Sequence, residues 1–538
     1  MKKFPTIKQR PQILKIKVDI IPYMNIKTET IAKGTLVIII ATFASKILGF
    51  IREILIAKYY GANVITDSYL VATILPSAMA GIIGGALTTV FIPLFIEERN
   101  KNGDQKAWEV ASSVIITSVI YLGIATLVAY FISPYFIRLI APGFDLERYS
   151  LSLRLNQIML PSIVFYGLLG LLTGLLQAYR HFSIPALATL MYNIFLISFI
   201  TIFYLNPVVG LGIGNLTGII AQALLVTFYL FRWKKLSLKD LKANFFHPII
   251  KKIFWLMVPI FFGTGISYIN LIVDRIFASK LPVGTIAALN FATRVKDIPI
   301  GLFAVALSQA IFPSAAQFAA KDETKNIREL LSRSLESLWL IMVPFTVGLI
   351  LLARPTVEFF FQRGAFTSVA TTITSEALVY YSLGVVAVAS LSIIGRFFYS
   401  YQDTSTPVKI SSIGLLINIG LNLILVRYMA HKGLALATSI SSIFISITLL
   451  EILRKKIGGI DGKVLLVNAL KIGLASLTMG IFILLTRNHI SNFVKFLVVG
   501  IGSLGIYTIM VITLRCREGM KLYQSLLKRL KHPSVTSS

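Results

Sequence analysis

The feature that most constrains the fold is a series of long apolar segments that recurs along the whole chain. About 20 apolar residues in a helix span the hydrocarbon core of a bilayer. Fourteen segments of the 538-residue chain approach this length, and 56% of all residues are hydrophobic, which is more than a single soluble core can bury. We therefore predict an all-α polytopic membrane protein of about fourteen transmembrane helices. The predicted spans are 34–58, 65–96, 107–132, 153–178, 184–205, 209–231, 252–273, 287–313, 330–353, 373–399, 408–427, 433–453, 464–486 and 491–514.

The charged residues predict the orientation of the chain. It has 52 Lys and Arg residues against 23 Asp and Glu residues, a formal net charge of +29. In a soluble protein this excess would suggest nucleic acid, but these charges lie mainly between the apolar segments, so we predict no nucleic-acid partner. The stretches 232–235, 454–456 and 515–531 are basic, whereas the loops 59–64 and 206–208 carry no charge. By the positive-inside rule, the basic loops and both termini should face the cytoplasm.

The sequence lacks the motifs of enzymes and ATP-driven pumps. It has no Walker loop, no HExxH motif and no GxGxxG motif that opens a helix after a strand. Its one cysteine, Cys516, excludes a disulfide framework and a cysteine-based zinc cluster. We therefore predict a transporter that needs no bound cofactor, rather than an enzyme.

An internal repeat divides the chain into two similar parts. A shift of about 220 residues places the segment 179–185 on the segment 401–407, so that a Tyr, a Ser and a Pro match. Duplication of this kind is typical of secondary transporters. Because each repeat holds an even number of spans, the two repeats should share one orientation in the membrane.

The repeat predicts two six-helix lobes, at 34–232 and 251–454, which rock about a central cavity to give alternating access. A lateral cleft between the lobes would admit a lipid. The rest of the chain is predicted to comprise a basic cytoplasmic tail at 1–33, a linker at 233–250, two additional helices at 455–514 and a second basic cytoplasmic tail at 515–538. The linker is either an amphipathic helix on the inner leaflet or a solvated connection.

Ionisable residues inside predicted spans are candidates for function, because the bilayer makes them costly. The first span carries Lys46, Arg52 and Glu53, and Glu53 could pair with a nearby basic residue. The eighth span carries Arg294, Lys296 and Asp297, of which Arg294 and Asp297 are spaced for a local ion pair. The surplus of positive charge suits a ligand that bears phosphate, because guanidinium groups bind phosphate through two parallel hydrogen bonds. Salt bridges between helices are the alternative interpretation.

The second predicted span has two further features of interest. Asp67 opens it, either as a functional acid or, with Thr66, as a helix N-cap. Gly84 and Gly85 follow Pro76, so this helix should be bent. The bend suits a gate that faces a cavity, although close helix packing would also explain the glycines.

Several short motifs, in this order along the chain, resemble those of a known family. They are the segments 45–53, 66–69, 141–144, 182–185, 362–367, 396–399 and 402–409. Over residues 34 to 514 the chain resembles the MurJ (MviN) family, the lipid II flippases of the multidrug/oligosaccharidyl-lipid/polysaccharide exporter superfamily.

The resemblance implies export of an undecaprenyl-pyrophosphate-linked peptidoglycan precursor from the inner to the outer leaflet of the bacterial cytoplasmic membrane. It implies membrane lipid as surroundings and peptidoglycan synthases as partners. The family arginines that meet the pyrophosphate correspond to Arg52, Arg294 and Lys46, the last a lysine in place of arginine, and Asp67 keeps an acid of the family. The resemblance thus implies Lys46, Arg52, Asp67 and Arg294 as substrate-binding residues. In the second span this chain departs from the family, because Ala80–Ala86 lacks two arginines and a glutamate.

The resemblance also implies a sodium site in the second lobe. The corresponding positions are Asp274, Asn418, Asn422, the carbonyl group of Leu434, and Thr438. All present the oxygen ligands that such a cation prefers, although Asn422 replaces a carboxylate of the family. Hydrogen bonding between helices would explain the two asparagines as well.

Other functions fit part of the sequence. The departure at Ala80–Ala86 suits a flippase for another polyprenyl-linked glycan, or a non-transporting scaffold for envelope assembly. A drug/cation antiporter of the same fold would prefer acidic cavity residues, and a membrane-embedded glycosyltransferase would need larger outer loops.

Overall fold

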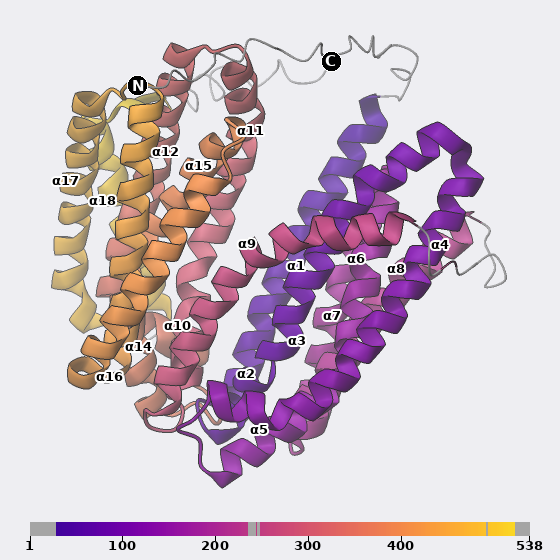
Figure 1. The fold of residues 1–538 in the computed structure, drawn as a ribbon. Helices are drawn as coiled ribbons and strands as arrows, with labels where there is room; N and C mark the ends of the chain where they lie inside the picture. The colour runs from indigo at the N-terminus through magenta and orange to yellow at the C-terminus, as the bar shows by residue number, and fades with distance from the viewer. Residues whose placement is uncertain (1–27, 235–243, 245–247, 491–492, 522–523, 525–538) are drawn as a thin grey trace, which may run out of the picture.

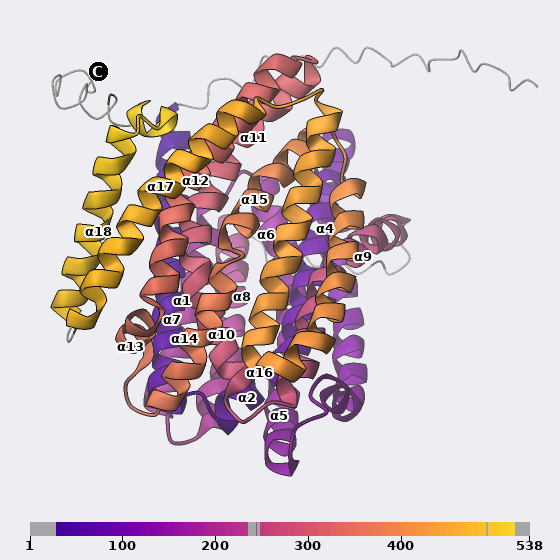
Figure 2. The same ribbon diagram turned by 90° about the vertical axis from the view of Figure 1, so that its left-hand side faces the viewer.

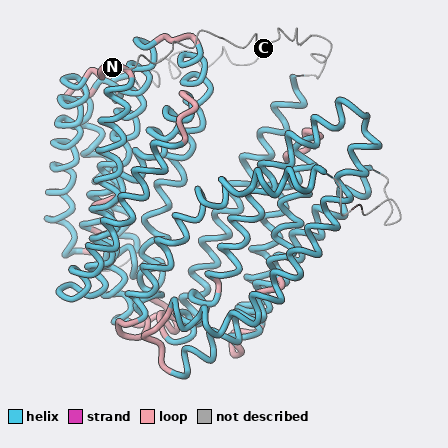
Figure 3. Tube along the Cα trace, in the orientation of Figure 1, coloured by secondary structure: helices cyan, strands magenta, loops and turns pink. Residues whose placement is uncertain are grey.

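The computed structural model describes residues 28–234, 244, 248–490, 493–521 and 524. Three predicted segments lie largely outside these residues. They are the N-terminal tail, the linker and the last part of the C-terminal tail. The described residues form helices and short connections without any β-strand (Figure 3).

The first half of the chain forms a helical bundle that ends at Lys234. Its helices are α1 (Thr28–Tyr60), α2 (Val64–Ala72), α3 (Ile74–Met79), the π-helical turn η1 (Ala80–Gly84), α4 (Gly85–Ile140), α5 (Leu146–Met159), α6 (Ser162–Ala178), α7 (Ser183–Ile202), the π-helical turn η2 (Val208–Ile213) and α8 (Gly214–Lys234). Helix α4 contains a break at Gly103, whose φ of 85° is unsuited to a continuous helix.

The second half begins with α9, after the predicted linker. Its helices are α9 (Pro248–Ser279), α10 (Thr285–Pro299), the π-helical turn η4 (Ile300–Ala304), α11 (Val305–Ala320), α12 (Thr324–Leu351), α13 (Ala353–Phe361), α14 (Ser368–Ser382), α15 (Val385–Ser400), α16 (Ser405–Lys456), α17 (Gly462–Thr486), the 3-10 turn η5 (Arg487–His489) and α18 (Phe493–Thr513). Helix α16 is broken at Ala430, where φ is 47°.

The predicted spans coincide with these helices to within several residues at each end. Among the described residues, nine helical stretches are long and apolar enough to cross a membrane, and the bent pair α14–α15 gives a tenth. Two of the nine, of 77 and 52 residues, contain the breaks at Gly103 and Ala430, and each therefore accounts for two predicted spans. Helices α1 and α9, of 33 and 32 residues, occupy two further predicted spans.

The two halves share a hydrophobic core at one end of the molecule. This joint core includes Ile56 of α1, Ile140 of α4, Ala287 of α10 and Leu434 of α16. Away from it, one core holds α4, α6 and α8 together in the first half, and a separate core holds α11, α12 and α15 together in the second. Figure 1 shows the consequence, because the halves meet near α2, α5 and α14 and diverge toward the opposite end.

Helix α9 and the pair α17–α18 do not belong to the separate cores of the two halves in the same way as the other helices. Helix α9 packs against α4 and η1 of the first half and against α16 of the second, so it bridges the two. Helices α17 and α18 pack on each other, and they pack on α12 at the outer edge of the second half (Figure 2).

One interaction recurs at matching places in the two halves. The Nζ atom of Lys234 lies 3.9 Å from the ring centroid of Tyr179, and that of Lys456 lies 5.3 Å from the ring centroid of Tyr401. Each lysine also forms an ion pair with an aspartate, and the hydrogen bond from Lys456 lowers the pKa of Asp403 to about 2. Both tyrosines and both lysines are 222 positions apart in the chain, which agrees with the shift of the predicted repeat.

Candidate functional site

A cavity of about 510 Å³ lies between the two halves, close to the core that joins them. Its wall is formed by α1, α2, α3, α5, α6, α7 and α8 from the first half and by α9, α10, α14 and α16 from the second. The charged residues that line it are Arg52, Glu53, Asp274, Arg275, Arg294 and Lys296. The wall is therefore mainly cationic, with four basic groups against two acidic groups.

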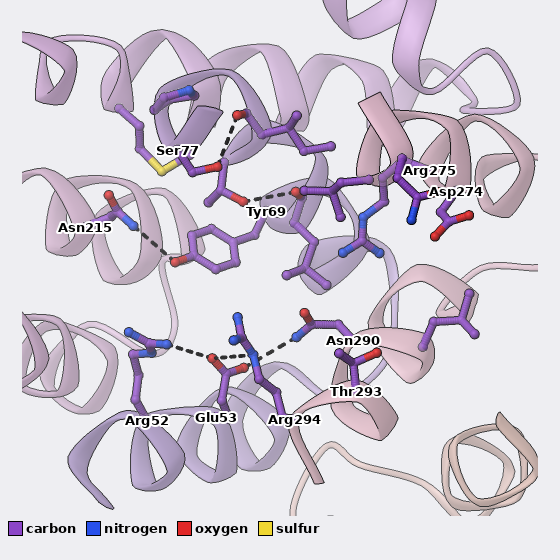
Figure 4. Close-up of a pocket in the computed structure, with 18 of the residues that line it drawn as sticks. Arg52, Glu53, Tyr69, Ser77, Asn215, Asp274, Arg275, Asn290, Thr293 and Arg294 are labelled. Carbon is purple, nitrogen blue, oxygen red and sulfur yellow. Dashed lines mark hydrogen bonds and ion pairs between the residues drawn. The ribbon is translucent and has the colours of Figure 1, made fainter. Parts of the chain in front are cut away.

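Glu53 lies at the centre of the charged wall and joins the two halves. Its Oε1 atom accepts a hydrogen bond of 2.8 Å from Arg52 and lies 3.5 Å from the Nε atom of Arg294 (Figure 4). Its Oε2 atom accepts a hydrogen bond of 3.5 Å from Asn290. Glu53 is only 5% exposed, and such a buried carboxylate needs these partners. The predicted cations Arg52 and Arg294 are thus held together at one point of the cavity.

The first half also lines the cavity with tyrosine and asparagine side chains. Arg52 donates a hydrogen bond to Asn193 and lies over the ring of Tyr192, 5.5 Å from its centroid. Asn215 donates hydrogen bonds to the hydroxyl oxygens of Tyr69, at 3.3 Å, and Tyr192, at 3.0 Å. These bonds fix the rings in place, so the wall offers flat aromatic faces and polar groups beside the cations.

Lys46 is the predicted substrate contact that lies apart from the cavity wall. Its amine donates a hydrogen bond of 2.8 Å to the carbonyl oxygen of Gly301 in η4. The residue is exposed, and it connects α1 to the eighth predicted span one and a half turns along the helix from Arg52. Its role in substrate binding stays a prediction.

Asp67 also lies outside the cavity wall, and its partners are backbone groups of the other half. Its carboxylate accepts hydrogen bonds of 2.7 Å from the amide of Gly284 and 2.8 Å from the amide of Ala287, at the start of α10. The cap of its own helix is Asn63, whose side chain accepts a hydrogen bond from the amide of Ile65. Asp67 therefore caps a helix of the opposite half, where an acid is favoured by the helix dipole.

Asp297 does not form the local ion pair expected from its spacing. Its Oδ1 atom lies 2.7 Å from the amine of Lys296, while Arg294 turns instead toward Glu53. A neighbouring lysine and a buried carboxylate on another helix are the stronger competitors for these two groups, so the predicted Arg294–Asp297 pair is wrong.

The glycines of the second predicted span serve close packing around a π-helical turn. Gly84 touches the backbone of α6, where a Cβ atom on Gly170 would meet the carbonyl group of Gly84. Gly81 faces Tyr268 of α9 so closely that any Cβ atom would collide with the phenol group. Gly85, in contrast, has no heavy atom of another segment within 4 Å of an added Cβ. The bend is present, and a gating role for Gly84 and Gly85 stays a prediction.

The residues predicted for a sodium site are gathered in the second half. Asn422 donates hydrogen bonds of 2.9 Å both to Asp274 and to Asn418, and the Thr438 hydroxyl donates one of 3.0 Å to the Leu434 carbonyl oxygen. The Oδ1 atom of Asn422 is buried and has no hydrogen-bond partner among the described residues. An unsatisfied buried oxygen beside a carboxylate and a second amide is the donor set that suits a hard cation.

Three kinds of cavity residue were not predicted from the sequence. Arg275 follows the seventh predicted span and was noted only as part of the charge cluster with Arg294, because a cation at the end of a span is inexpensive. The tyrosines Tyr69, Tyr166 and Tyr192 look like ordinary span residues. Lys296 was noted only as part of the charge cluster around Arg294. The sole available signal was proximity to Glu53 and Arg294, which requires the fold.

Comparison with known proteins places this architecture. The family model described as "Lipid II flippase MurJ" matches residues 56–502. A probable lipid II flippase MurJ of Buchnera aphidicola subsp. Acyrthosiphon pisum is 31% identical over 409 residues, which cover 74% of this chain and 79% of the relative. The lipid II flippase MurJ of Burkholderia cenocepacia is 29% identical over 425 residues, covering 77% and 82% of the two chains.

Solved structures agree with the sequence comparison. A lipid II flippase MurJ in an inward closed conformation has a TM-score of 0.76 and 29% identity, and the match covers 89% of this chain and 99% of that one. A multidrug resistance MATE family transporter of the MOP superfamily, in an inward-facing conformation, has a TM-score of 0.65 at 14% identity, covering 79% of this chain and 98% of that one, and so shares the fold alone.

Two helical bundles that enclose a charged cavity define a multi-pass membrane transporter, not an enzyme. The matches over most of its length identify the group more narrowly. The chain belongs to the MurJ family of lipid II flippases.

Proposed function

We propose that this protein flips lipid II, the undecaprenyl-pyrophosphate-linked peptidoglycan precursor, from the inner to the outer leaflet of the bacterial inner membrane. The observation that carries the proposal is the convergence of Arg52 and Arg294 on Glu53 inside the cavity between the halves. One carboxylate cannot neutralise both guanidinium groups, and so the site retains positive charge for an anionic head group.

The charge of the cavity wall favours an anionic passenger over a cationic one. The wall holds four basic side chains and two carboxylates, and the pairing of Lys296 with Asp297 outside the wall still leaves a positive surplus. A pyrophosphate diester carries two negative charges, so this surplus attracts it. Drug/cation antiporters of this fold would need the opposite balance. The ordered tyrosine and asparagine side chains beside the cations suit the sugar part of the head group.

The shape of the molecule supports entry from the cytoplasm. The halves diverge at the end where α8 and α16 finish in the basic residues Lys234 and Lys456. If basic ends face the cytoplasm, the open end faces inward and both termini are cytoplasmic. Rocking of the halves about their joint core would then open the other end. Reporter fusions at residue 538 test the orientation, since alkaline phosphatase should be inactive there and green fluorescent protein should fluoresce.

The direct test is translocation in a strain depleted of its own flippase. The wild-type chain should restore growth and the appearance of lipid II in the outer leaflet, and Arg294→Ala should restore neither while it still inserts in the membrane. Normal growth of the Arg294→Ala strain would remove Arg294 from the mechanism. Failure of the wild-type chain to restore lipid II translocation would contradict the proposed substrate.

A second substrate fits one specific observation. The segment Ala80–Ala86 carries no charged residue, and within the described cavity wall α2 and α3 contribute no basic side chain, so these helices hold the head group less strongly than an arginine-bearing helix would. A flippase for another polyprenyl-linked glycan would tolerate this difference. Failure to move lipid II, together with rescue of a different polyprenyl-glycan pathway, would identify that alternative.

Two further proposals concern an ion and a partner. Asp274, Asn418, Asn422, Leu434 and Thr438 would hold a sodium ion through oxygen atoms, and the ion would supply positive charge that screens the buried carboxylate. Peptidoglycan synthases are the partners that consume the product at the outer leaflet. Their association would be tested by cross-linking in intact cells.

A further inference from the structure

Arg275 of α9 is a buried cation of the cavity that forms no ion pair with any residue in the described part of the chain. Its side chain lines the cavity and the residue is only 9% exposed. The Nη1 atom donates a hydrogen bond of 3.2 Å to the carbonyl oxygen of Ile286. The Nε atom is buried and has no hydrogen-bond partner among the described residues. Figure 4 shows the guanidinium group pointing into the cavity between Tyr69 and Asn290.

The nearby carboxylates are engaged elsewhere. Asp274, next in sequence, accepts a hydrogen bond of 2.9 Å from Asn422 of α16. Asp67 accepts hydrogen bonds from the backbone amides of Gly284 and Ala287. Within the described part of the chain, neither acid lies within ion-pair distance of Arg275. A buried guanidinium group that no carboxylate contacts directly is only partly compensated, so an anion that enters the cavity would gain free energy by binding there.

We propose that Arg275 is a specificity-determining contact for the pyrophosphate group, on the opposite side of the cavity from Arg52 and Arg294. The inference rests on the proposed function, because it assigns a residue to the anionic part of that substrate. The hydrogen bond from Nη1 fixes the plane of the guanidinium group, and the edge that carries Nη2 forms no hydrogen bond within the described part of the chain. A phosphoryl oxygen at that edge gains a charge-assisted hydrogen bond.

The position of Arg275 also gives it a role that Arg52 and Arg294 cannot perform. Those two residues lie on α1 and α10 and share Glu53, whereas Arg275 lies on α9, which packs against both halves. The pyrophosphate would therefore bridge three helices. Among the residues of α9 that line the cavity, Arg275 is the basic one, and it therefore supplies positive charge from a third helix.

The test measures binding of two probes to the purified full-length protein by native mass spectrometry. Undecaprenyl pyrophosphate carries the anionic group, and undecaprenol carries only the lipid. We expect Arg275→Gln to weaken binding of undecaprenyl pyrophosphate by about tenfold or more, the equivalent of one charge-assisted hydrogen bond, without changing the binding of undecaprenol. Arg354→Gln is the matched control, because that arginine is 60% exposed and pairs with Glu358 on the surface.

The outcomes separate a binding role from a structural one. Unchanged affinity of Arg275→Gln for the pyrophosphate, or an equal loss for both probes, would overturn the proposal. If Arg275→Gln does not fold, Arg275→Lys decides, since lysine keeps the charge and loses the guanidinium geometry. That variant should bind the pyrophosphate several-fold more weakly, and wild-type affinity would overturn the proposal.

The same experiment distinguishes this proposal from the proposed function. A wild-type chain that binds undecaprenyl pyrophosphate through Arg275 but does not translocate lipid II would contradict the function alone. If the wild-type protein and the Arg275→Gln variant translocate lipid II equally well, the result would contradict only the role of Arg275.

Discussion

The Nε atom of Arg294 lies 3.5 Å from the Oε1 atom of Glu53, and this ion pair connects α10 of the second half to α1 of the first. Glu53 is buried and also binds Arg52, whereas the side chain of Arg294 is 46% exposed to the cavity. The carboxylate is thus the fixed element of the cluster. Arg294 is the member that can turn toward a ligand without leaving a charge buried.

Replacement of the two partners should have unequal effects on stability. Glu53→Gln leaves Arg52 and Arg294 facing each other without a counter-charge, so it should lower the free energy of unfolding by about 3 kcal/mol. Arg294→Gln should cost about 1 kcal/mol or less, because its exposed side chain contributes little to a solvated pair. Reversible denaturation of the purified protein measures both. Equal losses of unfolding free energy in the two variants would show that the Glu53–Arg294 pair, and not Glu53 alone, stabilises the cluster.

Asp67 provides a test of the contact that closes the other end of the cavity. Asp67→Asn retains one acceptor oxygen and loses the charge, so the start of α10 should separate more readily from α2, at a cost of about 1–3 kcal/mol. A cysteine at position 289, in a Cys516→Ser background, should then react faster with a membrane-impermeant maleimide added outside the cell. Asp145→Asn is the control, since Asp145 caps its own helix α5 and, among the described residues, its hydrogen bonds stay within the first half. Equal labelling of the two variants would contradict a closing role for Asp67.

These residues show how far the sequence could predict the structure. The spans were predictable because apolar length is a local property, and Arg52, Glu53 and Arg294 were predictable as candidates because charge inside a span is exceptional. The partner of Asp67 was not predictable, because it is a backbone amide 217 positions away, and a backbone amide is the same for every residue type except proline. Arg275 was not singled out for a related reason. That its Nε atom has no hydrogen-bond partner among the described residues depends on the neighbours that the fold places around it. The spacing of Arg294 and Asp297 misled because a helix on the other half supplied a better partner.

The contact between Gly81 and Tyr268 predicts a sharp difference between two glycine substitutions four positions apart. Gly81→Ala places a Cβ atom against the phenol of Tyr268, whose hydroxyl donates a hydrogen bond of 3.0 Å to the carbonyl oxygen of Ser77. Displacing the ring from its site should cost about 1–3 kcal/mol. Gly85→Ala is the control, because an added methyl group there meets nothing within 4 Å. Thermal unfolding of the two variants is the measurement.

A compensating variant checks the physical cause of this difference. Tyr268→Ala removes the colliding ring, so the double variant Gly81→Ala with Tyr268→Ala should be no less stable than Tyr268→Ala alone. A further loss in the double variant would place the strain of Gly81→Ala in the helix itself, not in the contact between η1 and α9.

The sodium proposal leads to a prediction in which stability, not transport, is the readout. Sodium chloride should raise the melting temperature of the purified protein more than choline chloride at equal ionic strength, because a ligand that binds only the folded state stabilises it. Asn422→Asp should increase this difference, since it places a carboxylate beside Asn418 and Asp274 and so strengthens attraction for a hard cation. Without sodium, the same variant should be less stable than wild type, because two buried carboxylates repel each other. Asn215→Asp, in the cavity wall of the first half, is the control and should gain no sodium dependence. If Asn422→Asp responds equally to both salts, these residues form an interhelical hydrogen-bond network and not a cation site.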